Sequence, residues 1–414
     1  MKSLNKVNSS TLNYIFLNTT IANIGGAELY ISHKLEHLEK LGYNVYVITF
    51  EVGNVVIENL KTYEKYIIPE LKIPFRRTTH KVRKSVINVF LKLNLHGTTI
   101  IESSFVNLNL WGEYIASQIK AYHICYLLPE TNDISPKDYN FFLFKYNQHC
   151  LYGITKNTIP QMMNDGGVYP NTTLTAVGCT ADAVNNENLY NIPNWKDADY
   201  TILSLGRLNK PYVPYMLAAV ENFIKAIGSN TVNLILVGGY INVSIRKKIN
   251  TISKYSKTIN IFYLGEMNPI PQVLFRKSDV AIAVAGCAGI CQRQGLPTIT
   301  IDANDFKAIG ILGKTTKNRI YREKEQPIEI TELLYKVLVE KEYVKSAPQK
   351  CLSRQNIDYS EHDKLLQIPS NYNYYQVSHK VDSYIDFFIK CAICILGCKK
   401  YYTMVTIFKR LITK

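Results

Sequence analysis

The 414-residue sequence has few acidic side chains and no long apolar run. Its 33 Asp and Glu are outnumbered by 48 Lys and Arg, which gives a net charge of +15. Because 47% of the residues are hydrophobic and only 20% are charged, the chain is neither disordered nor collagen-like, and its length allows two or three domains. The first apolar stretch, residues 14–17, is too short for a secretory signal or a membrane span, so we expect a cytoplasmic amino end.

Cysteine is present without the clustering of a disulfide scaffold. The nine cysteines are an odd number and are scattered along the chain, which predicts free thiols in a reducing compartment. The excess of positive charge predicts an acidic partner, which could be nucleic acid, anionic lipid or a phosphorylated small molecule.

Short apolar runs alternate with helical patterns along the chain. The first set predicts strands at 12–17, 43–50, 66–68, 98–101, 123–128 and 172–177. It predicts a helix that follows the turn at 25–28 and ends at 41, and further helices at 76–93, 108–120 and 137–148. After a linker at 182–199, a second set predicts strands at 200–205, 233–237, 259–264, 280–285 and 297–301.

Nearly continuous apolar strands are typical of parallel sheets that are buried on both faces. We therefore predict an α/β protein of two tandem Rossmann-like, doubly wound domains, residues 1–185 and 196–375, that face a central cleft. An amphipathic, basic helical segment at 376–414 follows.

Three glycine-rich turns follow predicted strands, where such folds bind ligands. The first is Gly25-Gly26-Ala27-Glu28, the second leads through Gly206 and Arg207 to Lys210, and the third runs from Ala285 to Ile290 before a short helix at 291–294. Glycine lets backbone N–H groups approach a phosphate, and the two cations suit a departing diphosphate. A tight turn or a solvated surface pair is the alternative for each.

The order of these pieces resembles a glycosyltransferase of the two-domain GT-B fold, of the family 4-like kind with which bacteria build surface polysaccharides. The motifs that carry the resemblance are Gly25, Gly26 and Glu28; Gly206, Arg207, Leu208 and Lys210; Leu236 to Gly238 and Gly239; Tyr263 to Gly265; and Gly295 to Pro297. The resemblance implies a nucleotide-sugar co-substrate with no other cofactor and no metal, in which Arg207 and Lys210 grip the diphosphate.

The sequence departs from that family in the loop before Gly295. The family usually carries two glutamates eight residues apart there, whereas residues 285–294 contain no acidic side chain. We expect Gly286, Ala288 and Gly289 to offer backbone donors instead, with Gln292 or Asp302 replacing a lost polar contact.

No catalytic base stands out in the first domain. Glu102, His123 and Glu130 lie at or near predicted strand ends and are the candidates. A structural role stays open for each, and His123 could be a satisfied core histidine.

Three patterns have the spacing of metal sites but favour other readings. Asp197 and Asp199 precede a strand, which indicates a linker. His33 and His37 have no third ligand and predict a solvated helix face. Cys391, Cys394 and Cys398 lack a fourth ligand and predict a packed or membrane-facing stripe.

The positive charge gathers in two places. Residues 71–101 hold seven cations and no acid, namely Lys72, Arg76, Arg77, Lys81, Arg83, Lys84 and Lys92. The tail from 384 to 414 combines basic residues with an apolar run of about twelve, too short to span a membrane. We expect an interfacial segment on an anionic membrane surface, although the tail could pack onto the first domain. Nucleic-acid binding is disfavoured because no reading module or interleaved aromatic surface is present.

The sequence thus predicts a metal-independent hexosyltransferase that is peripheral to the inner face of a bacterial cell membrane. It would move a sugar from a nucleoside-diphosphate sugar to a glycan or lipid-linked acceptor in surface-polysaccharide synthesis. A nucleotide-sugar epimerase on the same fold and a non-catalytic nucleotide-sugar or membrane-binding relative are the alternatives.

Overall fold

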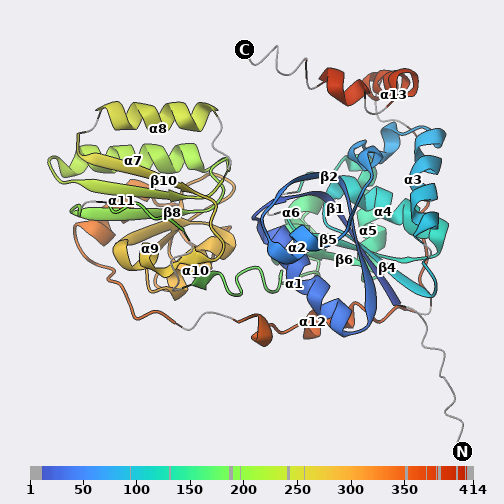
Figure 1. Cartoon of the computed structure of the whole chain (residues 1–414), viewed down its shortest axis with the longest axis horizontal. Coiled ribbons are helices and arrows are strands. Elements are labelled where there is room, and N and C mark those ends of the chain that lie inside the picture. Colours follow the sequence, from blue (N-terminus) through green and yellow to red (C-terminus); the bar gives the residue numbers. More distant parts are fainter. Residues whose placement is uncertain are drawn as a thin grey trace, which may run out of the picture. The chain divides into compact units, whose positions relative to one another are not determined.

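The computed structural model describes residues 12–93, 95–129, 132–185, 190–195, 197–239, 243–255, 257–349, 353–369, 371–378, 380, 384–397, 400–405 and 407. The chain divides into two compact units, each with its own six-stranded sheet (Figure 1). Unit 1 comprises Met1–Ala22, Tyr30–Val177 and Asp358–Lys414, and unit 2 comprises Asn23–Leu29 and Gly178–Ile357.

The sheet of unit 1 has the strand order β3-β2-β1-β4-β5-β6, which is the Rossmann order 3-2-1-4-5-6. Its strands are β1 (Leu12–Asn23), β2 (Tyr43–Val55), β3 (Lys65–Ile67), β4 (Thr98–Ser103), β5 (Tyr122–Leu127) and β6 (Leu151–Gly153). Its helices are α1 (Gly26–Lys40), α2 (Glu58–Thr62), α3 (His80–Lys92), α4 (Val106–Ile119), α5 (Tyr139–Asn147) and α6 (Thr158–Met163).

The sheet of unit 2 repeats this order as β10-β9-β8-β12-β13-β14, with β14 antiparallel to β13. Its strands are β8 (Tyr200–Leu205), β9 (Val232–Val237), β10 (Ile259–Gly265), β12 (Val280–Ala283), β13 (Thr298–Ile301) and β14 (Ala308–Ile311). Its helices are α7 (Val213–Ile227), α8 (Val243–Tyr255), α9 (Gln272–Lys277), α10 (Ala285–Arg293) and α11 (Ile330–Leu338).

Successive residues of the unit 2 strands pack into two different cores. Ile202 and Leu234 lie in a cluster with α7, α8 and α11, whereas Leu203 and Ile235 lie in a second cluster with α9 and α10. Figure 1 shows α7 and α8 on one side of the strands and α9 and α10 on the other. Burial on both faces explains why these strands are apolar without alternation.

The predicted architecture of two tandem Rossmann-like domains, which is the architecture named GT-B, is confirmed by the two sheets. Two local expectations are wrong, and one strand was not anticipated. Residues 172–177 form no strand of the sheet, and Thr173 alone makes an isolated bridge, to Gly153 at the end of the edge strand β6. The antiparallel β14 was not expected. The linker at 182–199 contains β7 (Val184–Asn185), which pairs with β11 (Ile270–Pro271), and Trp195, which is buried in the core of unit 2.

Residues 358–378, here called the strap, belong to unit 1 although the sequence assigned most of them to the second domain. They include α12 (Ser360–Lys364). Asp363 Oδ1 lies 2.7 Å from His37 Nε2, and the Tyr359 ring stacks on His37 with centroids 3.9 Å apart. His33 is 2% exposed. The solvated histidine face expected on α1 is therefore wrong, because His33 is buried and the strap covers His37.

After the strap, α13 (Tyr384–Leu396) lies against unit 1 near the start of α3 (Figure 1). Asp386 Oδ1 accepts from Arg77 Nε at 2.6 Å, and the Tyr402 hydroxyl donates to the Lys72 carbonyl at 3.2 Å. No helix in the described part of the chain is long and apolar enough to cross a membrane.

Candidate active site

Three glycine turns meet at the carboxyl edge of the unit 2 sheet. Gly206 follows β8, Gly238 and Gly239 follow β9, and Gly265 ends β10. The Gly206 amide donates to the Val237 carbonyl at 3.0 Å, and the Gly238 amide donates to the Gly265 carbonyl at 2.8 Å. Four predicted donor-site residues, distant in sequence, are thus brought into one backbone platform.

Two of these positions have no room for a larger residue. A Cβ atom on Gly238, whose φ is +155°, would lie 1.9 Å from the Gly206 carbonyl oxygen. A Cβ on Gly239 would lie 2.2 Å from Glu266 Oε1. The platform is therefore built by backbone packing directly against backbone and against a carboxylate, which only glycine permits.

Arg207 and Lys210 lie in the turn that follows Gly206. Leu208 between them is 1% exposed and anchors the turn in the core, whereas Arg207 is exposed and Lys210 is half-buried. The Leu208 amide donates to the Gly239 carbonyl at 3.0 Å. The turn thus presents a guanidinium beside backbone glycines, and the diphosphate-binding role that the sequence suggested for it stays a prediction.

Glu266 is a polar residue of this edge that the sequence analysis missed. Burial raises the pKa of its carboxyl group, while the positive charge of Arg207 acts in the opposite direction. Its Oε1 atom is buried without a hydrogen-bond partner in the described part of the chain. The signal that could have found it is its position directly after the Tyr-Leu-Gly strand end.

The third glycine-rich turn is a helix and not a loop. The sequence placed a helix only at 291–294, but α10 begins at Ala285, whose φ of +56° is unusual for a residue with a side chain. Ala288 and Gly289 therefore belong to the helical ladder, and the Ala288 amide donates to the Val284 carbonyl at 3.5 Å. Only the first turn, with Gly286, offers amides that the helix leaves without an acceptor of its own.

The first turn of α10 lies beside the glycine platform. Strands β8 and β12 are neighbours in the sheet, and the chain runs from β8 toward β10 on one side and resumes with β12 on the other. A Cβ on Gly206 would lie 4.0 Å from Cys287 Sγ. This is the topological switch point, where open α/β sheets bind their ligands outside the carboxyl ends of the strands.

Gln292 and Asp302, which we expected to replace the lost polar contact, have other surroundings. Gln292 lines a cavity of about 200 Å³ together with Gly313, Lys314 and Ser346. Asp302 accepts from the amides of Asn304 at 2.8 Å and Arg322 at 2.7 Å, so its carboxylate is occupied by its own loop. Neither is among the residues that contact the platform.

The Gly25-Gly26 turn belongs to the segment Asn23–Leu29 that groups with unit 2, and it leads directly into α1. The carboxylate of Glu28 folds back toward Gly25, where a Cβ would meet Glu28 Oε2 at 2.4 Å. Glu130 lies outside the described residues.

Glu102 is fully buried. Its Oε2 atom accepts from Lys34 Nζ and from the Tyr14 hydroxyl, both at 2.6 Å, and the Tyr30 hydroxyl lies 3.0 Å away. Burial lowers the pKa of Lys34, against the opposing charge of Glu102. This is a buried ion pair with its lone pairs satisfied by protein groups.

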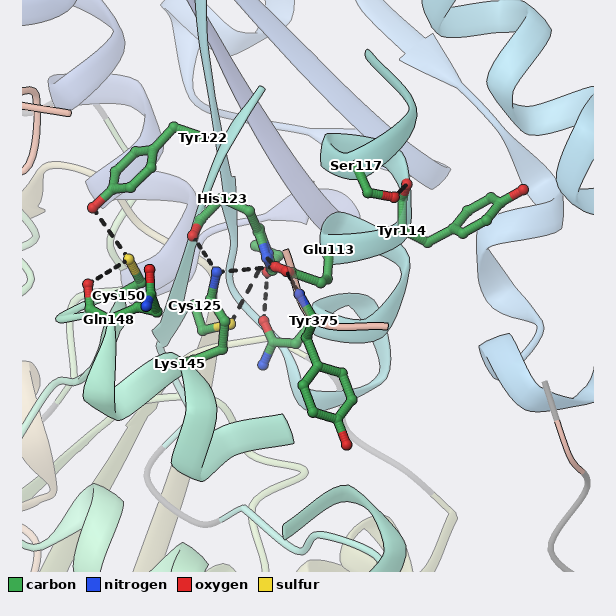
Figure 2. A network of polar contacts seen from close by, with 12 residues as sticks. Glu113, Tyr114, Ser117, Tyr122, His123, Cys125, Lys145, Gln148, Cys150 and Tyr375 are labelled. Carbon is green, nitrogen blue, oxygen red and sulfur yellow. Dashed lines mark hydrogen bonds and ion pairs between the residues drawn. The ribbon is translucent and has the colours of Figure 1, made fainter. Parts of the chain in front are cut away.

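His123 has the surroundings of a core histidine (Figure 2). Its Nδ1 lies 2.9 Å from Glu113 Oε2 and its Nε2 lies 2.7 Å from Ser103 Oγ. Lys145 Nζ donates to Glu113 Oε2 at 3.0 Å. Burial, and then the charge of Lys145, lowers the pKa of His123 to about 4.

Ser103, His123 and Glu113 are hydrogen-bonded in the order in which a catalytic triad joins its nucleophile, its base and its acid. However, all three side chains are fully buried, so no substrate reaches them. Glu102 and His123 therefore have structural partners, and the geometry of unit 1 supplies no exposed base at either position.

The patterns with the spacing of metal sites have other surroundings in the described part of the chain. Asp199 accepts from the Thr231 amide at 2.7 Å, which joins the starts of β8 and β9. Cys391 is half-buried, Cys394 is exposed, and Cys398 lies outside the described residues. Among the described residues, no group of three or more His, Cys, Asp or Glu side chains is placed to hold a metal ion.

Comparisons with known proteins give structural likenesses only. Neither protein-family models nor curated proteins give a match. Among solved structures, the chain is similar to WaaG, a glycosyltransferase involved in lipopolysaccharide biosynthesis, at 13% identity over 79% of this chain and 91% of that one, with a TM-score of 0.49. It is similar to the lipopolysaccharide outer core galactosyltransferase WaaB at 13% identity over 92% and 99%, with a TM-score of 0.48.

The UDP-GlcNAc 2-epimerase of Neisseria meningitidis, solved with UDP-GlcNAc bound, is also similar, at 11% identity over 86% of this chain and 99% of that one, with a TM-score of 0.44. The likenesses thus include sugar transferases and sugar-nucleotide epimerases.

Proposed function

We propose that the protein is a metal-independent glycosyltransferase that moves a hexosyl group from a nucleoside-diphosphate sugar to a glycan or lipid-linked acceptor in surface-polysaccharide synthesis. The observation that carries the proposal is the platform of Gly206, Gly238 and Gly265 at the switch point of unit 2, with Arg207 exposed beside it. Backbone amides and a guanidinium at such an edge suit a diphosphate.

In this proposal the bond between the sugar and the diphosphate breaks, and negative charge grows on the leaving phosphate. Arg207 and Lys210 neutralise that charge, and the first turn of α10 adds its amides and the positive end of its dipole. Glu266, with its unpartnered Oε1, accepts from a hydroxyl or amide of the nucleoside.

Thermal unfolding with UDP, GDP, CDP and ADP tests the donor site. A nucleotide at about 100 times its dissociation constant stabilises the protein by about 2.7 kcal/mol, which is several degrees for units of this size. Arg207→Ala should lose the shift, whereas Arg246→Ala, which removes an exposed arginine from α8, should keep it. A protein that melts cooperatively and ignores all four nucleotides would refute the donor site.

Product analysis separates the alternatives. A transferase consumes the sugar nucleotide only when an acceptor is present. An epimerase converts the sugar nucleotide without an acceptor, and a non-catalytic relative binds it and leaves it unchanged.

We further propose that unit 1 docks on an anionic membrane surface at the cytoplasmic face. Helix α13 carries large apolar side chains that are strongly exposed, with Tyr384 at 86%, Phe388 at 69% and Ile395 at 81%. The structure shows that only some of the basic side chains beside α13 are exposed. Lys72, Arg76 and Arg77 are ion-paired and Arg83 donates to Thr78, whereas Lys81, Lys84 and Lys92 are exposed on or at the end of α3.

Vesicle sedimentation tests this surface. Phe388→Ser with Ile395→Ser removes two inserted side chains, each worth about 1.5–3 kcal/mol, and should reduce binding to anionic vesicles more than tenfold. Val168→Ser is the matched control, because Val168 is 86% exposed and lies elsewhere in the chain. Equal binding by all forms, or equal binding to neutral vesicles, would contradict the proposal.

A further inference from the structure

Arg293 and Arg319 of unit 2 both lie at helix α10, and among the described residues neither is paired with a carboxylate. Arg319 lays its guanidinium over Gly289 of α10, where a Cβ atom would lie 2.9 Å from Nη1. Arg293 ends the same helix. Burial lowers the pKa of Arg319, and the positive charge of Arg293 acts in the same direction.

Neither guanidinium has an ion-pair or hydrogen-bond partner among the described residues. By contrast, Arg322, three residues after Arg319, has a counter-charge, because its Nη2 pairs with Asp305. Two adjacent, partly desolvated guanidinium groups are unfavourable unless an anion joins them. The pair therefore has the charge of a site whose ligand is negative.

The pair lies on its own face of α10. Gly286, Gly289 and Arg293 are three and four residues apart and so share one side of the helix. A Cβ on Gly286 would lie 3.4 Å from Thr180 Cγ2 on this side. Cys287, which faces Gly206, lies about 160° around the helix from Gly289 at 100° per residue. The arginine pair is thus separate from the Gly206 and Arg207 platform.

We propose that Arg293, Arg319 and the Gly286–Gly289 face of α10 bind a carboxylate or phosphate group of the substrate other than the donor diphosphate. Glycines on this face leave the guanidinium forks open for a bidentate contact. The site rests on the proposed function for its substrate. The anion comes either from the donor sugar, as a uronate carboxylate, or from a phosphorylated lipid acceptor.

The first experiment tests the site without assuming any activity. The thermal midpoint of the full chain is measured while inorganic phosphate replaces chloride at constant ionic strength. We expect a rise of about 2–4 °C that Arg319→Gln and Arg293→Gln lose. Arg246→Gln, which removes an exposed arginine of α8, should keep the rise. If every variant responds like the parent, phosphate binds elsewhere and the proposal is wrong.

The second experiment identifies the source of the anion. Calorimetry compares UDP-glucuronate with UDP-glucose, GDP-mannuronate with GDP-mannose, and farnesyl diphosphate with farnesol. Loss of a uronate preference of about tenfold or more in Arg319→Gln assigns the donor carboxylate, and loss of a diphosphate preference assigns the acceptor.

If neither preference depends on the arginines, the substrate role is overturned. If no nucleotide sugar binds at all while the phosphate response depends on Arg293 and Arg319, the donor assignment fails and the anion site stands.

Discussion

Two buried histidines predict that unit 1 loses stability in mild acid. His362 is 1% exposed, and its Nε2 donates to the Thr175 carbonyl at 2.8 Å, because a carbonyl can only accept. Burial, and then the charge of Lys34, lowers the pKa of His362 to about 3. His123 is similarly neutral in the folded state, with a pKa lowered to about 4.

The sign of the effect follows from where the proton binds. Both pKa values lie below the usual histidine value of 6.5. As the pH falls below 6.5, the unfolded chain therefore binds protons at these two side chains before the folded chain does. Stability is complete above about pH 6.5 and is lost as the pH falls toward 4 and then 3. At about 1.4 kcal/mol per pH unit, each histidine costs about 2 kcal/mol at pH 5.

The assay uses the two tryptophans of the chain, Trp111 and Trp195, which are buried in different units. In a Trp195→Phe background, fluorescence during urea unfolding reports unit 1 alone. His362→Gln keeps an N–H donor for the Thr175 carbonyl and removes the titration. Its loss of stability between pH 7.5 and pH 5 should be about 2 kcal/mol smaller than that of the parent.

His80→Gln provides the control, because His80 is exposed at the start of α3. It should leave the pH dependence unchanged. If His362→Gln and the parent lose the same free energy of unfolding, the buried imidazole is not the acid-sensitive group and the reasoning is wrong.

Three further results are expected. Gly238→Ala should lower the free energy of urea unfolding of unit 2 by about 2–4 kcal/mol and abolish nucleotide binding, because its Cβ would lie 1.9 Å from a carbonyl oxygen; normal binding would contradict the close packing. Lys34→Met should lower the free energy of urea unfolding of unit 1 by about 3–5 kcal/mol, since it leaves the buried Glu102 carboxylate without its counter-charge; an unchanged free energy of unfolding would contradict this reasoning. In mass-spectrometric thiol labelling, Cys394 should react at once, whereas Cys125, which is buried and whose pKa burial raises, should react only on unfolding.

The sheets and glycine turns could be predicted because their causes are local. A run such as residues 233–237 is apolar throughout since both faces of its strand are covered. The glycines after these strands were expected at a donor site, and Gly206, Gly238 and Gly265 do meet at one edge of the sheet. Helix α10 was misplaced because its glycines were taken for a loop, whereas their lack of side chains accommodates Arg319 and Thr180.

The remaining features depend on contacts between residues far apart in the sequence. His37 looked solvated because the strap that covers it begins more than 300 residues later. Arg293 and Arg319 belong to a helix and a distant loop, and no periodicity relates them. Glu102 and His123 looked catalytic because they lie on strands, but their partners Lys34, Glu113 and Lys145 come from helices packed on those strands.

The strap also explains how the tail is held beside the basic helix. The Tyr372 hydroxyl accepts from Lys145 Nζ at 2.8 Å, and the Tyr375 amide donates to Glu113 Oε1 at 2.7 Å. These bonds tie the strap to the buried pair of Glu113 and Lys145. Helix α13 follows in the chain, and its Asp386 pairs with Arg77, three residues before the start of α3. The two halves of the proposed membrane surface, more than 280 residues apart in sequence, are thus joined by the core of unit 1 itself.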